Sequence, residues 1–506
     1  MVIEASLGGV IAAAFTLLLA SFAIEQLLVP RPTLLRPWPA YGLHAGLIML
    51  AQALLVLLLG RPWFAAAAVA AFILLLVQVN NAKMHSLREA FVFQDYEYFT
   101  DAILHPRLYI PFLGWWKFLA AVVGFALAVV VGLYGEDVPA HRFDWHGQLG
   151  GVALLLLSSM LLLWLGKRQH LPVSLQPEQD IFALGFLACL WRYAEAERVP
   201  PQASSPFSKL EQPTGNTVLP HLVAVQSESF FDARRLFSGI RADVLQAYDL
   251  LKQDAASHGA LQVPAWGANT VRSEFAFLSG IEAEQLGVHR FNPYRTVAAG
   301  WGVASLASYL KQLGYRTVCI HPYPASFYRR DRVYPRFGFD EFLDIRHFDE
   351  SMRAGPYTGD MAVADRIAAI LGEAKQPVFI FAITMENHGP LHLEQQTEAD
   401  ISALYHAAPP AGCEDLTIYL RHLRNADRMI HSLRQTLAQC PQPASLCWYG
   451  DHVPIMPAVY QVFGVPDGAV EYVLWANRTV QCQKVEAEGK TAQSLARDWL
   501  QMLGLA

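Results

Sequence analysis

The sequence lacks several features that mark common classes of protein. None of its six cysteines belongs to a Cys-x-x-Cys pair, which argues against a zinc site built from thiolates. No run of basic residues is present and the net charge is only −6, which argues against nucleic acid as a partner. Only 16% of the residues are charged. What remains is an apolar chain of 506 residues, long enough for more than one domain.

Long apolar stretches are concentrated in the first 170 residues. Runs of about 17–20 apolar residues are long enough to cross a bilayer as helices, and five such runs occur here. The first run has no basic segment before it and no cleavage site after it, so we predict a retained helix instead of a signal peptide. The five predicted spans are Ser6–Ile24, Ala40–Gly60, Trp63–Val79, Phe118–Tyr134 and Leu149–Gly166.

Loop charges leave the orientation of these spans open. If the C-terminal half lies outside the cytoplasm, the inside loops carry only Arg61 and Arg142, whereas the positive-inside rule favours the reverse. Residues 81–110 are too polar to span the bilayer and suit a segment at its surface. We divide the chain into a transmembrane domain (1–170), a juxtamembrane amphipathic helix with a Pro/Ser-rich linker (171–217) and a globular domain (218–506).

The globular part alternates short apolar runs with amphipathic helical segments. Strands that are apolar along their whole length and alternate with helices indicate a mostly parallel sheet with helices on both faces. The predicted strands cover residues 221–228, 315–322, 377–386, 445–452 and 469–477. The expected fold is therefore an α-helical transmembrane domain followed by an α/β domain. Cys440 and Cys447 flank a short loop and are either a disulfide, if the loop is extracytoplasmic, or two free thiols.

Acidic and imidazole side chains collect where four predicted strands end. They are Glu228, His321, Glu386 with His388, and Asp451 with His452. Ligands of open α/β sheets bind at the carboxyl ends of strands, although any one such residue can simply be where the chain meets water. A carboxylate with an Asp-His pair suits manganese, magnesium or zinc, and such a metal activates a hydroxyl nucleophile. Composition does not choose among four candidate hydroxyls: Ser227, Ser229, Thr270 and Ser273.

The order of the polar motifs resembles the lipoteichoic acid synthase and phosphoglycerol transferase branch of the alkaline phosphatase superfamily. Five segments carry this resemblance, and their order along the chain is more specific than any one of them. They are VQSESF (225–230), GANTVRSEF (267–275), HPYPASFYRRDRVYPRFGFDEF (321–342), TMENHGP (384–390) and YGDH (449–452). The resemblance covers roughly residues 218–480 and extends to the N-terminal spans. It implies an alkaline-phosphatase-like catalytic domain.

Carried over to this chain, the resemblance implies one divalent metal ion, foremost Mn²⁺, with Mg²⁺ or Zn²⁺ as alternatives. The implied metal ligands are Glu228, Thr270, Asp451 and His452. Thr270 would also be the nucleophile that attacks phosphorus. The implied substrate residues are His321, Tyr328, Arg330 and His388. Among them, Arg330 and His388 would hold phosphate oxygens, and the other two would line the head-group pocket. Arg330 and His388 would also be catalytic, Arg330 by stabilising charge on the equatorial oxygens and His388 by protonating a leaving oxygen or positioning the phosphate.

Each substrate residue also has a plainer interpretation. Arg330 can be an ordinary ion-pairing residue of an Arg-rich loop, and His321 can be structural. Tyr328 is expected to pack more than to act in catalysis, and it stands where the best-known family members have Trp. Asn269 and Arg272 also depart from the family pattern around the nucleophile. These departures bear on the donor and acceptor, not on the metal chemistry.

The resemblance implies transfer of a phosphoglycerol head group, or a related phospho-alcohol, from a membrane phospholipid such as phosphatidylglycerol. The acceptor would be a glycan or polymer of the cell envelope. The alternatives are phosphoethanolamine transfer or ester hydrolysis within the same superfamily, and an inactive membrane sensor or scaffold. Sulfatase activity proper is disfavoured, because the Cys/Ser-x-Pro-x-Arg element is missing. The expected location is a bacterial inner membrane, with the catalytic domain in the periplasm.

Overall fold

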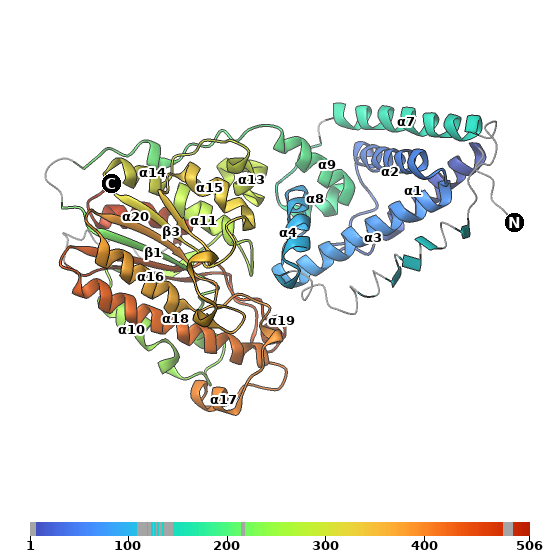
Figure 1. Ribbon diagram of the computed structural model, residues 1–506. Coiled ribbons are helices and arrows are strands. Elements are labelled where there is room, and N and C mark those ends of the chain that lie inside the picture. Colours follow the sequence, from blue (N-terminus) through green and yellow to red (C-terminus); the bar gives the residue numbers. More distant parts are fainter. Residues whose placement is uncertain are drawn as a thin grey trace. The chain divides into compact units, whose positions relative to one another are not determined.

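The computed structural model of the chain describes residues 7–108, 145–169, 171–213, 218–478 and 489–506, with isolated residues between 119 and 135. The chain divides into two compact units, residues 1–199 and residues 200–506 (Figure 1). The regular structure that is described in the first unit is all helical, and the second unit is built around a β-sheet. Each unit is described by itself below.

The first unit contains long apolar helices. Among its described residues, four helices are long and apolar enough to cross a membrane. They are α1 (Leu7–Glu25), α2 (Trp38–Leu59), α3 (Pro62–Leu87) and α7 (Trp145–Arg168). These helices confirm four of the five predicted spans, and the remaining one, Phe118–Tyr134, lies mostly outside the described residues. Helix α3 continues eight residues beyond its predicted end, and two short helices follow it, η1 (Phe93–Glu97) and α4 (Tyr98–Leu104).

Helices α2 and α7 pack closely because glycines face the partner helix. A Cβ atom at Gly46 would lie 2.8 Å from Leu163 Cγ, and one at Gly166 would lie 2.9 Å from Leu43 Cγ. Small residues at such contacts are typical of helix pairs in membranes, where close van der Waals packing drives association.

The predicted juxtamembrane helix is interrupted by a glycine. The segment forms α8 (Pro177–Leu184) and α9 (Phe186–Glu197), two helices in place of one. Gly185 between them has a φ of 83°, and a Cβ atom there would lie 1.9 Å from Arg36 Nη1. The Arg36 guanidinium pairs with Glu25 at 2.7 Å, and Glu25 also accepts a hydrogen bond from the first backbone N–H of α9. This buried network ties α9 to the end of α1.

The second unit contains an eight-stranded sheet in the order β10-β2-β9-β8-β1-β7-β3-β4. Strands β8, β1, β7, β3 and β4 run parallel, while β9 is antiparallel to both β8 and β2. The central strands are buried along their whole length, as expected for a sheet covered on both faces. The strands are β1 (His221–Ser227), β2 (Ser257–Gln262), β3 (Arg316–Ile320), β4 (Glu341–Leu343), β7 (Val378–Ile383), β8 (Ala444–Gly450), β9 (Val470–Ala476) and β10 (Lys490–Thr491).

Helices cover both faces of this sheet (Figure 1). One face carries α10 (Gln246–Gln253), α16 (Asp360–Glu373) and α18 (Glu414–Gln439). The other carries α11 (Thr270–Ser279), α14 (Leu306–Gln312) and α20 (Ala492–Met502). The remaining helices are α12 (Ala283–Leu286), α13 (Pro293–Ala298), α15 (Arg330–Phe337), α17 (Glu398–Leu404) and α19 (Pro457–Phe463). A small hairpin, β5 (Arg353–Ala354) with β6 (Tyr357–Thr358), precedes α16.

All five predicted strands are confirmed as β1, β3, β7, β8 and β9, and the sheet is mostly parallel as predicted. The structure adds β2 and the two short edge strands β4 and β10, whose sequences lack a continuous apolar run. Cys440 and Cys447 are both free thiols, so the disulfide alternative is not realised.

Candidate active site

The carboxyl ends of β1 and β8 bring two acidic residues together. In the register of these parallel strands, Ser227 lies opposite Gly450, so Glu228 and Asp451 leave the sheet side by side. The residue at position 450 has to be glycine, because a Cβ atom there would lie 2.2 Å from the backbone oxygen of Phe230. The tight crossing of these two segments therefore sets the spacing of the two carboxylates.

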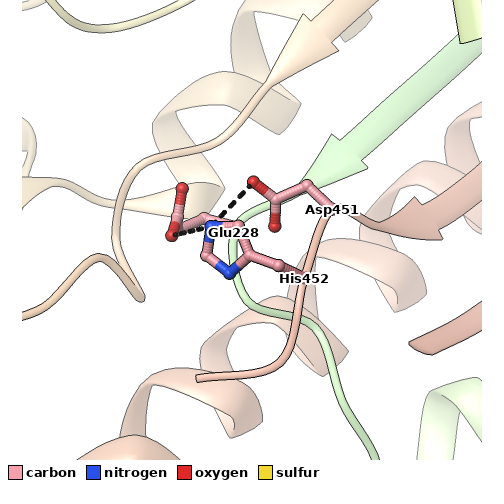
Figure 2. A group of neighbouring side chains, drawn as sticks. All are labelled: Glu228, Asp451 and His452. Carbon is pink, nitrogen blue, oxygen red and sulfur yellow. Dashed lines mark ion pairs between the residues drawn. The ribbon is translucent and has the colours of Figure 1, made fainter. Parts of the chain in front are cut away.

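Glu228, Asp451 and His452 form a compact set of possible metal ligands (Figure 2). One ligand atom from each residue lies within 4.8 Å of the other two. His452 Nε2 is 3.3 Å from Asp451 Oδ2 and 3.6 Å from Glu228 Oε1. All three side chains are buried, and two carboxylates with one imidazole form a donor set that suits a divalent cation.

The hydrogen bonds around this group leave the ligand atoms free. Asp451 Oδ1 accepts a hydrogen bond from Ser229 N at 2.8 Å, while Asp451 Oδ2 has no hydrogen-bond partner among the described residues. His452 Nδ1 donates to Val453 O at 3.1 Å, which leaves Nε2 as the unprotonated nitrogen, also without a hydrogen-bond partner there. Buried polar atoms without partners are costly, so these two atoms fit a bound cation.

The charge of the site points to the same conclusion. Burial, together with the negative charge of Asp451, raises the pKa of Glu228 to about 8. The Ser229 hydroxyl donates to Glu228 Oε1 at 2.9 Å and partly offsets this effect. A divalent cation would neutralise both carboxylates, which cannot comfortably be ionised together in a buried site.

Thr270 is the first residue of α11, and it is buried. Ser273, one turn further along the same helix, donates from Oγ to Asp451 O at 2.7 Å. This bond fixes the first turn of α11 next to the metal-ligand loop. The positive end of a helix dipole at this position suits an anionic phosphate.

The two predicted substrate histidines lie on neighbouring strand ends. His321 Nδ1 donates to Ile383 O at 3.2 Å, and its buried Nε2 has no hydrogen-bond partner among the described residues. Burial, with the positive charge of Arg330, holds the pKa of His321 well below its usual value. His388 Nδ1 donates to Gly389 O at 2.7 Å, and burial also lowers the pKa of His388. Both imidazoles are therefore neutral, with Nε2 as an acceptor.

Arg330 takes part in a buried ion pair. Its side chain is only 1% exposed, and its guanidinium contacts both carboxylate oxygens of Glu274, with Nε at 3.1 Å from Oε2. The hydroxyls of Tyr294 and Tyr334 donate to the same Oε2 at 2.8 and 2.6 Å. Arg330 is thus an ion-pairing residue, and the pair lies in the interior and not on a surface loop. Its charge still reaches the site, because it helps to lower the pKa of Glu228.

Left-handed backbone conformations surround the site. Ser229, Asn269, Tyr328 and Arg329 all have φ between 52° and 63°, which is uncommon for residues other than glycine. Tyr328 is half-buried, and its ring centroid lies 4.1 Å from the centroid of the Phe327 ring. The same Tyr328 centroid lies 5.2 Å from Arg330 Cζ. Strained backbone of this kind clusters at functional sites, where the surrounding structure holds it in place.

For several residues of the site, the sequence did not predict the role that the structure shows. Ser229 and Ser273 appeared only as candidate nucleophiles, and the structure shows them as hydrogen-bond donors to Glu228 and Asp451. Glu274 was part of a motif, but its pairing with Arg330 depends on a contact 56 residues apart along the chain. The sequence feature that pointed to these residues was the Thr-x-x-Ser-Glu spacing, which places Ser273 and Glu274 on one helix with the predicted nucleophile.

Comparison with known proteins identifies the catalytic unit. The sulfatase family matches residues 220–505, more than half of the chain. The capsular polysaccharide biosynthesis protein RkpI of Rhizobium meliloti is 25% identical over 446 residues, which are 82% of this chain and 77% of that protein. A lipoteichoic acid synthase of Staphylococcus saprophyticus is 28% identical over 146 residues, 28% of this chain and 22% of the synthase.

One solved structure matches nearly the whole chain. The integral membrane protein lipooligosaccharide phosphoethanolamine transferase A from Neisseria meningitidis aligns with a TM-score of 0.57 at 13% identity. The match covers 98% of this chain and 94% of that protein, and at this identity it shows the shared fold alone. The chain thus shares its overall fold with a known integral membrane protein. Four of the described helices are long and apolar enough to cross a membrane, and the chain belongs to the sulfatase family.

Proposed function

We propose that this protein transfers a phosphoglycerol head group from a membrane phospholipid to a glycan of the cell envelope. The reaction proceeds through a covalent phosphate ester on Thr270 and depends on one divalent metal ion, foremost Mn²⁺. The donor is phosphatidylglycerol. The catalytic unit works outside the cytoplasm of a bacterial inner membrane, where both envelope glycans and the outer leaflet are accessible.

The observation that carries this proposal is the position of Thr270. Its helix begins at that residue, and Ser273 ties the first turn of the helix to Asp451 by a 2.7 Å hydrogen bond. A hydroxyl at a helix N-terminus beside a metal-ligand set has the elements of an activated nucleophile for phosphate esters. A bound divalent cation would lower the pKa of the hydroxyl and stabilise charge on the phosphate oxygens.

The residues of the chain divide the chemistry between them. Thr270 Oγ forms a bond to phosphorus, the ester bond to diacylglycerol breaks, and the leaving oxygen takes up the proton from Thr270. His388 is neutral, and its Nε2 is the base that accepts the proton from Thr270 and passes it to the leaving oxygen. In the second step the hydroxyl of the acceptor attacks phosphorus, the bond to Thr270 breaks, and the proton returns to Thr270. His321 Nε2, an acceptor without a partner, binds a hydroxyl of the head group.

The nature of the donor and acceptor rests on two further observations. Helices long enough to cross a membrane keep the enzyme in the bilayer that contains a lipid donor. RkpI, which aligns with most of this chain, is named for capsular polysaccharide biosynthesis, and this supports a glycan acceptor.

The test uses the full chain, purified in detergent with Mn²⁺ and given fluorescent phosphatidylglycerol or phosphatidylethanolamine. Diacylglycerol release is compared among the wild type, Thr270→Ala, Thr270→Ser and the control Thr397→Ala. Thr397 is an exposed residue that caps α17 and lies outside the site. We expect release from phosphatidylglycerol by the wild type and the control, reduced release by Thr270→Ser, and none by Thr270→Ala.

Other results change the proposal in defined ways. Release from phosphatidylethanolamine alone keeps the mechanism and replaces the donor. Equal release by the wild type and Thr270→Ala removes Thr270 as the nucleophile. No release from either lipid by a metal-loaded, folded protein favours the inactive sensor or scaffold.

A further inference from the structure

A second buried group of charged side chains lies outside the metal site, on the face of the sheet that α18 covers. Glu386 (2% exposed) follows β7, and His422 (2% exposed) lies on α18. His422 Nδ1 is 3.1 Å from Glu386 Oε1, and His422 Nε2 is 2.9 Å from Glu394 Oε1. The imidazole therefore lies between two carboxylates, and the three side chains form a continuous chain of ion pairs.

The hydrogen bonds require His422 to be positively charged. Both ring nitrogens face carboxylate oxygens, so both of them donate. Burial by itself lowers the pKa of His422, but the hydrogen bonds with Glu386 and Glu394 raise it to about 9. Burial and the negative charge of Glu386 raise the pKa of the nearby Asp360 on α16 well above its usual value. Arg421 pairs with Glu394 at 2.8 Å on the outer side. A buried series of ion pairs of this kind holds the participating side chains in one arrangement.

Both carboxylate oxygens of Glu386 accept hydrogen bonds. Its Oε1 also accepts a hydrogen bond from Asn425 on α18, and its Oε2 accepts one from the backbone N–H of Asp360 at 2.8 Å. The carboxylate thus joins α18 and the first residue of α16 to the turn that follows β7. His388 lies on this same turn, two residues after Glu386.

The β5–β6 hairpin holds the other side of His388. The Tyr357 hydroxyl donates to Gly389 O at 3.1 Å, and the Tyr357 ring meets the His388 ring edge-on at 5.6 Å. Gly389 O is also the acceptor for His388 Nδ1. The hairpin comes close to Glu394 at Gly355, where a Cβ atom would lie 3.0 Å from Glu394 Oε2.

We propose that Glu386 and His422 are positioning residues that hold His388 in the orientation needed for proton transfer. The inference rests on the proposed function, since it gives His388 its task, and extends it to residues that touch no substrate. The charged pair fixes the turn before His388, and Tyr357 fixes the backbone after it. With the turn fixed at both ends, the His388 Nδ1–H stays on Gly389 and Nε2 stays available to the reacting oxygen.

The test combines amide hydrogen exchange with a double-mutant cycle on the full chain in detergent with Mn²⁺. The variants are His422→Ala, Glu386→Gln, His388→Ala and the double variant His388→Ala/His422→Ala. The control is His431→Ala, an exposed histidine on the same helix whose Nε2 forms a hydrogen bond with Gln435. Glu386→Gln keeps the size of the side chain and serves if His422→Ala does not fold.

Hydrogen exchange reports on the turn whether or not the lipid assay succeeds. We expect faster exchange in the peptide 384–392 for His422→Ala and Glu386→Gln, and unchanged exchange there for His431→Ala. Unchanged exchange of this peptide in both site variants overturns the inference. Failure of the wild type to release diacylglycerol from either lipid counts against the proposed function alone.

The kinetic arm separates positioning from general loss of stability. We expect His422→Ala to lower kcat by up to about 100-fold, the effect of a small misplacement of a catalytic group, with little change in KM. In the His388→Ala background the same substitution then has no further effect on kcat, because its influence passes through His388. Equal losses in both backgrounds, or an unchanged kcat in His422→Ala, overturn the inference.

Discussion

At the scale of single residues, Ser229 shows how one hydroxyl supports the metal ligands. Its Oγ donates to Glu228 Oε1 at 2.9 Å, and its backbone N–H donates to Asp451 Oδ1 at 2.8 Å. The backbone bond survives substitution, whereas the hydroxyl bond does not. Residues that orient metal ligands in this way affect affinity although they do not touch the metal.

We predict that Ser229→Ala weakens Mn²⁺ binding by about 10–100-fold, the usual cost of losing an outer hydrogen bond to a ligand. Isothermal titration calorimetry on the metal-free protein measures this change. Ser227→Ala is the matched control, because this neighbouring buried hydroxyl has no hydrogen-bond partner among the described residues. Equal affinities for Ser229→Ala and the wild type would contradict the role of Ser229.

His422 gives a prediction for pH. Its pKa is about 9 in the folded protein and near 6.5 when unfolded, so the folded state binds the proton more tightly. The stabilisation is fully present below about pH 6.5 and is lost as the pH rises through about 9. We expect the difference in Tm between the wild type and His422→Gln to be largest near pH 6 and to shrink toward pH 10. A difference that grows with pH would show that His422 is not held as a cation.

At the scale of elements, the crossing of β1 and β8 determines the spacing of the metal ligands. A Cβ atom at Gly450 would lie 2.2 Å from Phe230 O and 3.1 Å from Val470 Cβ. The nearest of these atoms is backbone, which cannot turn aside as a flexible side chain does. Any side chain at position 450 therefore pushes the end of β8 away from β1, and Asp451 away from Glu228.

We predict that Gly450→Ala destabilises the protein by roughly 1–3 kcal/mol, as overpacking does, and also weakens metal binding. Gly372→Ala is the control, because a Cβ atom at Gly372 in α16 meets nothing within 4 Å. That substitution is expected to stabilise the helix by roughly 0.5–1 kcal/mol. Thermal unfolding with and without Mn²⁺ measures both, and a Gly450→Ala protein as stable as the wild type would contradict the steric argument.

At the scale of the whole molecule, the chain combines a helical unit suited to lipid with an α/β unit suited to water. The apolar helices of the first unit expose many large hydrophobic side chains, including Phe15, Leu58 and Leu157. Exposed apolar surface of this kind fits contact with acyl chains and not with water. The second unit has one extensive core that surrounds the central sheet.

The orientation of the chain in the membrane gives a prediction at this scale. The proposed substrates require the catalytic unit outside the cytoplasm, although the loop charges favour the reverse. In a bacterial host we expect alkaline phosphatase fused to the C-terminus to be active and a green fluorescent protein fusion at the same position to be dark. The opposite pattern would place the catalytic unit in the cytoplasm and exclude envelope glycans as acceptors.

The main elements of both units could be predicted from the sequence alone. Apolar runs of sufficient length identified four helices that the structure confirms, because a helix must cover the thickness of the bilayer with apolar residues. Continuous apolar strands identified the central sheet, and polar residues at strand ends predicted that Glu228, Asp451 and His452 lie together, as the structure shows. Each of these signals is local, so it can be read from neighbouring residues in the chain.

The hydrogen bonds between side chains that are distant in the sequence could not be predicted without the folded structure. Arg330 pairs with Glu274, whereas the family resemblance implies a role for Arg330 at the phosphate. The fold placed His422 between Glu386 and Glu394, which no motif connects. It also broke the juxtamembrane segment at Gly185, where the Arg36 guanidinium occupies the space of a side chain. Such contacts depend on chain crossings between distant segments, and these are fixed only when the whole unit has folded.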